Sequence, residues 1–253
     1  MKQNRFISTN ALILKINKVN EKNKLVYFLS PTLGLQKGYA YGGMSLNNKT
    51  TAALDHFCIC HFLLYKKEKD ELYTIKEVKL LNMFYPIRNH LKRYYSISFF
   101  NEIYLNISIP ENEAKYYYNL LYNLQTYIET LNIRKIDQAI IFFLIRLLKI
   151  MGFCAPFHIC VVCQTRKPPF FLSVKYKGIV CLSHYQSQDC EIGDSALEKL
   201  IKIQNEPFNE IVQLSFIKEE EKIILGYYLK VIKIILDKPI KTLDVLKRSG
   251  ILG

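Results

Sequence analysis

Two pairs of metal-ligating residues constrain this chain most. Cys160 and Cys163 form a C-x2-C pair, and Cys181 and His184 form a C-x2-H pair after residues 164–180. A two-residue gap lets one tight turn point both side chains at a single ion, and two such turns complete a tetrahedral zinc site. The intervening residues suit a short hairpin that brings the second pair opposite the first. The spacing therefore predicts a zinc ribbon at about residues 154–190, with one Zn²⁺ per chain.

Other interpretations of these residues stay open. Cys154, His158 and Cys190 lie close enough in sequence to compete with His184 for the fourth position. The cysteines could be ordinary buried thiols or a redox pair, although the βαβ context typical of a redox pair is missing. Four protein ligands would leave the ion no open position for water, so the zinc is expected to be structural.

The charge of the chain favours polyanionic partners. The formal net charge is +13, and residues 1–84 hold 13 Lys or Arg against 6 Asp or Glu. A surplus of this size is typical of proteins that bind nucleic acid or anionic membranes, and the plainer alternative is a solvated, lysine-rich surface. The N-terminal third is the better candidate for a polyanion-binding surface.

Cysteine usage and hydropathy indicate a reducing compartment. Seven cysteines occur, no leader peptide is evident at the start, and the most apolar run, 139–145, is too short to span a bilayer. We therefore expect a cytoplasmic protein whose thiolates remain available for metal.

The residue pattern divides the chain into two domains. Five strands with short turns are predicted at 11–16, 24–30, 35–40, 54–65 and 72–81, which suits a small closed barrel. The order is compatible with an OB-fold, and strand counting alone does not exclude an SH3-like barrel. The predicted fold class is thus α+β multidomain: an OB-fold-like barrel over 1–84, then a helical domain over 85–253 that contains the inserted zinc ribbon.

From Pro86 onward the apolar period is helical. A capping-box pattern at 108–111 is expected to open the second helix, and Asp194 is expected to cap the one that follows the ribbon. Gly152 and Pro239 are expected to stop two others. The predicted helices cover 88–108, 111–131, 136–151, 195–204, 218–237 and 241–249.

Several segments together resemble the family of the bacterial recombination mediator RecO over essentially the whole chain. The residues Ala11–Leu14, Glu21, Lys24–Val26 and Ser30–Gly34 look like the family's opening strand, turn and T-P-x-x-G segment. Met151–Pro156 resembles the family's segment before C-x-x-C. Tyr228-Leu229 and Leu236–Thr242 resemble the family's closing pattern. The chain departs from the family at 40–45, which lacks the usual basic A-K-G-x-R-R segment, and His184 replaces the usual fourth Cys.

The resemblance implies a binding role in DNA repair rather than an enzyme. Such proteins bind single- and double-stranded DNA, anneal complementary strands, engage the acidic C-terminal tail of the single-strand-binding protein, and work with RecR in loading the recombinase. They would be cytoplasmic and nucleoid-associated during repair. One alternative is a zinc-ribbon protein that acts on RNA or in transcription, and a second alternative is a metal-dependent hydrolase.

The DNA-binding residues are expected at turns and strand ends of the barrel, where long cations can reach phosphates without sequence preference. These residues are Lys22, Lys24, Lys37 and Lys49. Tyr39 and Tyr41 could add base stacking, although a packing role is the alternative.

The tail of the single-strand-binding protein would need an apolar groove rimmed by cations. One candidate stretch is 88–95, where Arg88, Lys92 and Arg93 accompany apolar residues. The other is the Lys230 and Lys233 face of the long helix, where Tyr227, Val231 and Ile234 lie on neighbouring turns. We expect the two stretches to act together, and solvated amphipathic faces are the alternative.

Overall fold

The computed structural model describes residues 5–42, 54–67 and 69–248. The chain forms two compact units: residues 1–131 with 242–246, and residues 132–241 with 247–253. The last strand of the first unit ends at Asn82, and its first helix starts at Tyr85. The first unit therefore contains helices as well as the strands that precede them. Within the described residues, no helix is long and apolar enough to cross a membrane.

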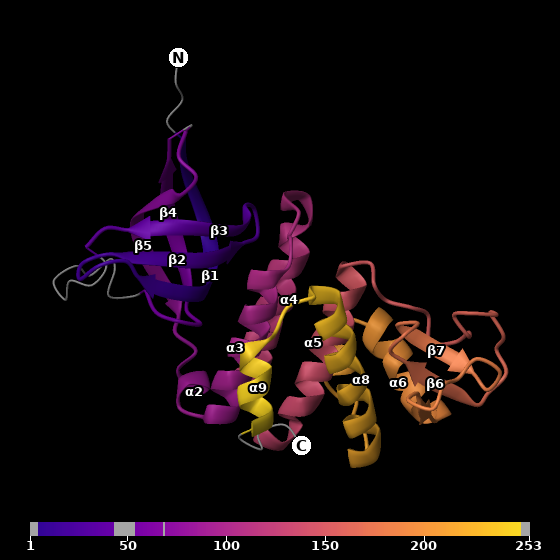
Figure 1. The fold of residues 1–253 in the computed structure, drawn as a ribbon. Coiled ribbons are helices and arrows are strands. Elements are labelled where there is room, and N and C mark those ends of the chain that lie inside the picture. The colour runs from indigo at the N-terminus through magenta and orange to yellow at the C-terminus, as the bar shows by residue number, and fades with distance from the viewer. Residues whose placement is uncertain (1–4, 43–53, 68, 249–253) are drawn as a thin grey trace. The chain divides into compact units, whose positions relative to one another are not determined.

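Five strands close into a barrel, as predicted (Figure 1). Their order round the barrel is β1-β2-β3-β5-β4, and β4 pairs back onto β1, which is consistent with an OB-fold. All neighbours are antiparallel except β3 and β5, which pair in parallel. The strands are β1 (Arg5–Lys18), β2 (Lys24–Ser30), β3 (Gly34–Ala40), β4 (Ile59–Lys66) and β5 (Tyr73–Asn82).

β1 closes the barrel because it pairs with a different neighbour along each half. Its first half pairs with β4 from Arg5 to Leu12, and its second half pairs with β2 from Leu12 to Lys18. The register with β2 shifts between Ile13 and Lys15, and such a bulge bends a strand and increases its twist. The expected strand at 11–16 covered only the stretch around this bend.

Alternate residues of the strands fill the barrel. Phe28 and Phe62 are fully buried and meet edge to face with ring centroids 5.3 Å apart. Gly38 is required here, since an added Cβ would lie 2.8 Å from Ile75 Cγ1. The intervening residues of each strand face outward.

Three helices and one 3₁₀ turn follow the barrel within the first unit: α2 (Tyr85–Arg88), α3 (Leu91–Asn106), η1 (Glu111–Glu113) and α4 (Ala114–Thr130). Asn101 ties α3 to the barrel by donating its Nδ2–H to the Leu14 carbonyl over 3.1 Å. The predicted capping box at 108–111 is wrong, because α4 begins at Ala114. A helix capped by Ser108 would place Ile109 in a helical conformation directly before Pro110, which proline disfavours.

The second unit is built round α5 (Ile136–Ile150), which is buried along nearly its whole length. α5 contacts α6 (Asp194–Asn205) and α8 (Lys218–Leu236), and α7 (Phe208–Ile211) is a short turn between them. Gly152 ends α5 as expected, with a left-handed φ of +76°. Asp194 does not cap α6, because Gly193 occupies the cap position and Asp194 is the first helical residue.

The predicted ribbon interrupts these helices as a three-stranded sheet. Its order is β7-β6-β8, from β6 (Phe170–Ser173), β7 (Gly178–Cys181) and β8 (Cys190–Ile192). The third strand was not expected. The last helix, α9 (Lys241–Arg248), is held by Thr242, whose N–H and Oγ1–H both donate to the Glu102 carboxylate on α3 at 2.8 and 2.5 Å.

Candidate metal centre and nucleic-acid interface

Two backbone turns present the four predicted metal ligands. In the first, the Gln164 N–H donates to the Cys160 carbonyl over 2.8 Å. In the second, the His184 N–H donates to the Cys181 carbonyl over 2.9 Å, directly after β7. The first turn lies against β7 because position 178 is glycine: a Cβ there would come within 2.6 Å of Val161 Cγ1.

The ligand atoms of Cys160, Cys163, Cys181 and His184 all lie within 4.8 Å of one another, so the cluster could hold a metal ion. The Sγ atoms of Cys163 and Cys181 are 3.7 Å apart. His184 Nδ1 lies 3.4 Å from Cys181 Sγ and 4.0 Å from Cys160 Sγ. Ordinary Zn–S and Zn–N bonds at tetrahedral angles give ligand edges of about 3.5–3.8 Å, so the side chains fit zinc.

The electrostatics of the cluster also suit a cation. Burial opposes ionisation of Cys160, but the backbone amides of Cys163, Cys181 and Val162 outweigh it and lower the pKa of this thiol to about 6. The Thr165 amide would lower the pKa of Cys163, yet the neighbouring Cys160 and Cys181 raise it above its ordinary value. Ionisation of one cysteine therefore opposes ionisation of its neighbour, and a bound divalent cation would offset the repulsion between the two thiolates.

The competing ligands lie in other surroundings. Cys154 Sγ accepts a hydrogen bond from Gln204 Nε2 at 2.6 Å, and Gln204 belongs to α6. Cys190 is exposed on β8, and His158 is exposed as well. The geometry therefore favours His184 as the fourth member of the cluster.

A cross-strand row of two lysines and a tyrosine marks the outer surface of β1, β2 and β3. Lys15 is opposite Tyr27, and Tyr27 is opposite Lys37. The Nζ atoms of Lys15 and Lys37 lie 5.9 and 5.4 Å from the centroid of the Tyr27 ring. We call this surface, extended along β3 by Tyr39 and Tyr41, the Tyr27 face.

The two tyrosines at the end of the Tyr27 face offer ring surface to solvent. Tyr39 and Tyr41 are packed on each other with centroids 4.6 Å apart, and Tyr41 is 64% exposed. Lysines beside exposed rings are the combination with which proteins hold single strands, because cations contact phosphates and bases stack on rings. Lys15 and Tyr27 were missed in the sequence, because only strand register places them beside Lys37.

The other lysines expected to contact DNA have different surroundings. Lys22 is exposed in the β1–β2 turn. Lys24 is half-buried, and its Nζ donates to the Leu54 carbonyl over 2.9 Å; burial, more than the nearby Lys18, lowers its pKa against the pull of Asp55. Lys49 lies outside the described residues.

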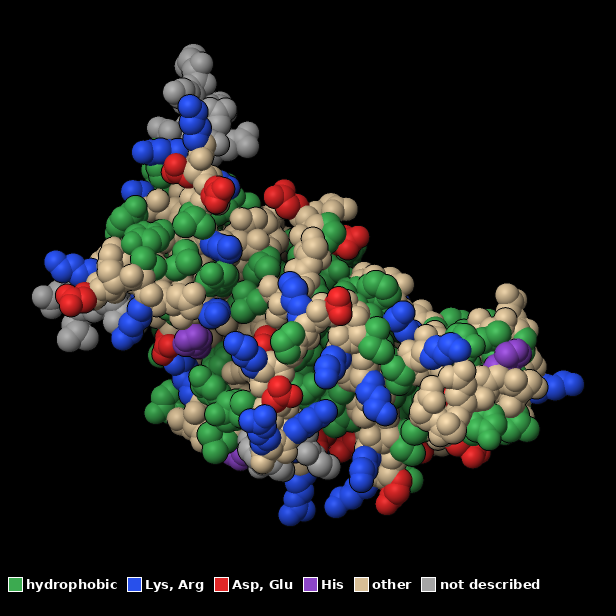
Figure 2. All heavy atoms as spheres, in the orientation of Figure 1, with side chains coloured by type: hydrophobic (Ala, Val, Ile, Leu, Met, Phe, Trp, Pro, Cys, Tyr) green, Lys and Arg blue, Asp and Glu red, His purple; other side chains and the backbone are tan. Residues whose placement is uncertain are grey.

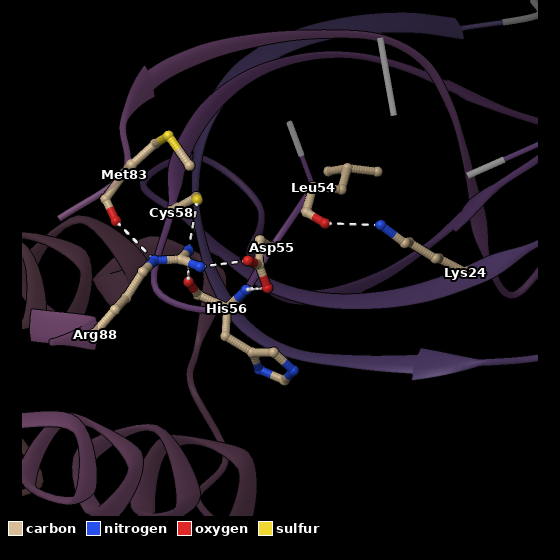
Figure 3. A network of polar contacts seen from close by, with 7 residues as sticks. All are labelled: Lys24, Leu54, Asp55, His56, Cys58, Met83 and Arg88. Atoms are coloured by element: carbon tan, nitrogen blue, oxygen red, sulfur yellow. Dashed lines mark hydrogen bonds and ion pairs between the residues drawn. The ribbon is translucent and has the colours of Figure 1, made fainter. Parts of the chain in front are cut away.

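A polar network holds the segment before β4 against α2 (Figure 3). The Arg88 guanidinium forms an ion pair with Asp55 and also donates to the carbonyls of His56 and Met83. Its Nη2 lies 3.2 Å from Cys58 Sγ. Burial alone would raise the pKa of Asp55, but the hydrogen bonds from Arg88 and the His56 amide hold it below its ordinary value. The Arg88 guanidinium is thus engaged in bonds within the first unit, which is a structural role.

The remaining residues of the expected tail groove belong to both units. Arg93 donates to the Leu131 carbonyl over 2.9 Å, and Lys92 is half-buried on α3. Lys230 and Lys233 are exposed on α8. Of the apolar residues near them, Ile234 is 53% exposed, whereas Tyr227 and Val231 are buried.

Comparison with known proteins matches most of the chain to two family models. Residues 1–84 match the family model described as "Recombination protein O N terminal", and residues 88–244 match "Recombination protein O C terminal". The chain is 23% identical to "DNA repair protein RecO" of Syntrophus aciditrophicus, over 96% of this chain and 97% of that protein. It is 27% identical to the protein of the same name from Clostridium novyi, over 95% and 94% of the two chains.

The metal cluster predicts the result of replacing single ligands. Purified protein should contain about one zinc per chain, and Cys181→Ser should lose it because a serine hydroxyl is a poor zinc ligand. Cys190→Ser and Cys154→Ser are matched controls that should retain zinc. Metal analysis by mass spectrometry checks this. A control that loses zinc, with a His184→Ala variant that keeps it, would contradict the assigned ligand set.

The Asp55–Arg88 pair predicts a pH-dependent contribution to stability. The pKa of Asp55 is lower in the folded chain than its ordinary value of 3.8, so the contribution is present above that pH and is lost as pH falls through the folded pKa. Asp55→Asn should cost about 1 kcal/mol of unfolding free energy at pH 7, since the Asp55 side chain is half-exposed and solvent screens the pair. Urea unfolding from pH 7 to pH 3 measures the difference, with exposed Asp70→Asn as control. A difference that grows towards low pH would contradict this role.

Proposed function

The chain belongs to the RecO family of DNA repair proteins, and we propose that it acts as a recombination mediator that binds single- and double-stranded DNA through its barrel. The observation that carries the proposal is the Lys15–Tyr27–Lys37 row together with the Tyr39–Tyr41 pair, of which Tyr41 is exposed. The positive charge of the chain supports it, and Figure 2 shows Lys and Arg side chains predominating over acidic ones on the visible surface.

The Tyr27 face is suited to a strand of any sequence. Lys15 and Lys37 are exposed, and their register places them on either side of one ring. Each cation can contact a phosphate, while Tyr41 offers a ring on which any base can stack. Lys15 and Lys37 thus provide a basic surface in a chain whose residues 40–45 lack the family's usual basic segment.

The protein is proposed to act by binding and not by catalysing a reaction. The acidic run Glu219–Glu221 opens α8, where Glu220 accepts hydrogen bonds from the Ile217 N–H and from Lys199 at 3.3 and 3.2 Å. These contacts stabilise a helix N-terminus, which is a structural task. We assign Zn²⁺ to the cysteine cluster in a structural role, since four protein ligands would leave it no open position.

The proposed partners are those that the resemblance to the family implies. We propose that the chain binds the single-strand-binding protein and RecR, and that it helps to load the recombinase in the cytoplasm, at the nucleoid during repair. An acidic tail with a terminal apolar residue needs exposed cations beside an exposed apolar side chain. Lys230, Lys233 and Ile234 on α8 meet that requirement within one unit. On α3, in contrast, Arg93 already bonds to the Leu131 carbonyl.

The Tyr27 face predicts a specific loss of salt dependence. The Lys15→Ala/Lys37→Ala variant should bind single-stranded DNA more weakly, and the slope of log affinity against log salt should fall by about 1.4, as two phosphate contacts are lost. Lys218→Ala/Lys222→Ala removes equal charge from exposed positions on α8 and should leave the slope unchanged. Fluorescence anisotropy over a salt series measures both. An unchanged slope in the first variant would place the DNA site elsewhere, and a preference for structured RNA would contradict the repair role.

The exposed residues Lys230, Lys233 and Ile234 of α8 predict that charge reversal there weakens binding of the tail peptide selectively. Lys230→Glu/Lys233→Glu should weaken binding of a labelled acidic tail peptide at least tenfold, because charge reversal repels the peptide carboxylates. The affinity for DNA should change less than twofold. A peptide titration checks the first expectation, with Lys202→Glu, exposed on α6, as the control. Unchanged peptide affinity would mean that the tail docks on another surface.

A further inference from the structure

One thiol of the metal cluster is exposed to solvent. Cys163 is exposed, and so are its neighbours Val162 and Gln164, whereas Cys160 and Cys181 are buried. The sulfur of Cys160 also accepts hydrogen bonds from the backbone amides of Val162, Cys163 and Cys181. A reagent that arrives from solution therefore reaches Cys163 before it reaches the other two cysteines of the cluster.

A second thiol lies beside the exposed one. The Sγ atoms of Cys163 and Cys181 are 3.7 Å apart, and a disulfide bond is about 2.05 Å long, so the sulfurs have to approach by only about 1.7 Å. Cys181 is the last residue of β7, and Cys163 lies in a turn that precedes β6. The approach can therefore take place in the turn, without breaking a strand pair.

The register of the small sheet excludes the other exposed cysteine, Cys190, as a partner for Cys181. The two residues lie on β8 and β7, on opposite sides of β6, where they face Leu172 and Phe170 respectively. Two strand spacings separate their Cα atoms by about 10 Å or more, and a disulfide spans at most about 7 Å between Cα atoms. The half-buried Cys154 is hydrogen-bonded to α6 instead. Cys163 is thus the exposed thiol that can bond to Cys181.

We propose that Cys163 is an oxidation site, at which a hydroperoxide converts the ribbon reversibly into a form closed by a Cys163–Cys181 disulfide. The exposure of Cys163 decides where the oxidant attacks, and the neighbouring sulfur of Cys181 decides how the oxidised residue is resolved. Thiolates that are accessible and have a second thiol beside them are the ones that proteins oxidise reversibly.

The chemistry takes two steps. The Cys163 thiolate attacks one oxygen of hydrogen peroxide, the O–O bond breaks, and the second oxygen takes up a proton and leaves as water, so that Cys163 carries a sulfenic acid. The Cys181 thiolate then attacks the sulfur of that acid, the S–S bond forms, and the hydroxide that leaves is protonated to water. Altogether two thiolates, one peroxide and two protons give one disulfide and two waters.

The disulfide uses two of the three thiolates in the ligand set. Cys160 and His184 remain, and they are too few for a structural zinc site, which takes four ligands. Because the fourth ligand is an imidazole, Cys160 has no second cluster thiol left and stays reduced. Loss of zinc on oxidation rests on the proposed assignment of Zn²⁺ to the cluster, whereas the disulfide depends only on where the sulfurs lie.

Peroxide treatment of the full-length protein, freed of reductant, tests the proposal. A chromogenic chelator follows zinc release, the remaining thiols are alkylated, and the protein is digested with trypsin without reduction. Cleavage after Lys and Arg places Cys160 and Cys163 in peptide 150–166, and Cys181 in peptide 178–199. The expected product is a cross-link between these two peptides, which fragmentation in the mass spectrometer assigns to Cys163 and Cys181.

The cross-link should form together with release of about one zinc per chain, and a dithiol with added zinc should reverse both. Cys154→Ser and Cys190→Ser are matched controls that lie outside the cluster and should form the same cross-link. Substitution of Cys163 itself removes a ligand, so its role is measured in the wild-type chain. A limiting amount of iodoacetamide should alkylate Cys163 about tenfold faster than Cys160.

Three results would overturn the proposal. One is a Cys160–Cys163 bond, which would stay inside peptide 150–166, and another is a bond that requires Cys190. The third is zinc loss with Cys163 in a sulfinic or sulfonic acid and no disulfide, since those products are not resolved by a thiol. Zinc content before peroxide tests the metal assignment separately. A chain isolated without zinc that still forms the Cys163–Cys181 bond would refute the metal assignment and support the oxidation site.

Discussion

The pairing of β1 with two different neighbours is the constraint on which the barrel depends. Its first half bonds to β4 and its second half to β2, and the irregularity between Ile13 and Lys15 bends the strand from one to the other. Without that bend the sheet would have two open edges. The same bend divides the outward residues of β1, so that Phe6 faces out beside β4 while Lys15 faces out beside β2. Closure of the fold and the outward position of Lys15 on the Tyr27 face therefore depend on the same irregularity in β1.

A second constraint acts where the barrel joins its helices. Arg88 bonds at once to a carboxylate, two carbonyls and a thiol, which fixes the segment 54–58 against α2. Phe57 and Phe84 adopt left-handed backbone conformations with φ of 68° and 47°, which bulky residues seldom adopt. The network and the burial of both rings offset that cost. In the second unit, four ligands round one ion would add to the burial of β6 and β7 in stabilising the small ribbon.

The sequence predicted those features that depend on local spacing. The cysteine and histidine cluster follows from two two-residue gaps, and the five strands follow from alternation and turn residues. The first expectation to fail was the capping box at Ser108, because proline at 110 excludes the helical conformation of Ile109. The helix predicted at 88–108 corresponds to α3, which starts at Leu91 because His90 caps it, and the short helix α2 before it was not expected. The strand β8 is too short, at Cys190–Ile192, to leave a periodic signal.

Binding surfaces could be predicted less well because they depend on register and on which side chains are already engaged. Lys37 was identifiable, but its partners Lys15 and Tyr27 come from strands whose alignment the sequence does not specify, and Arg88 and Lys24 are cations that the fold itself uses. The central claim is that DNA binds to the outer surface of the barrel strands. Carbon-13 labelling of the tyrosine rings, followed by titration with single-stranded DNA, tests it most directly. The account predicts that the ring resonances of Tyr27, Tyr39 and Tyr41 shift during the titration. Shifts confined to helical tyrosines such as Tyr116 and Tyr122 would contradict it.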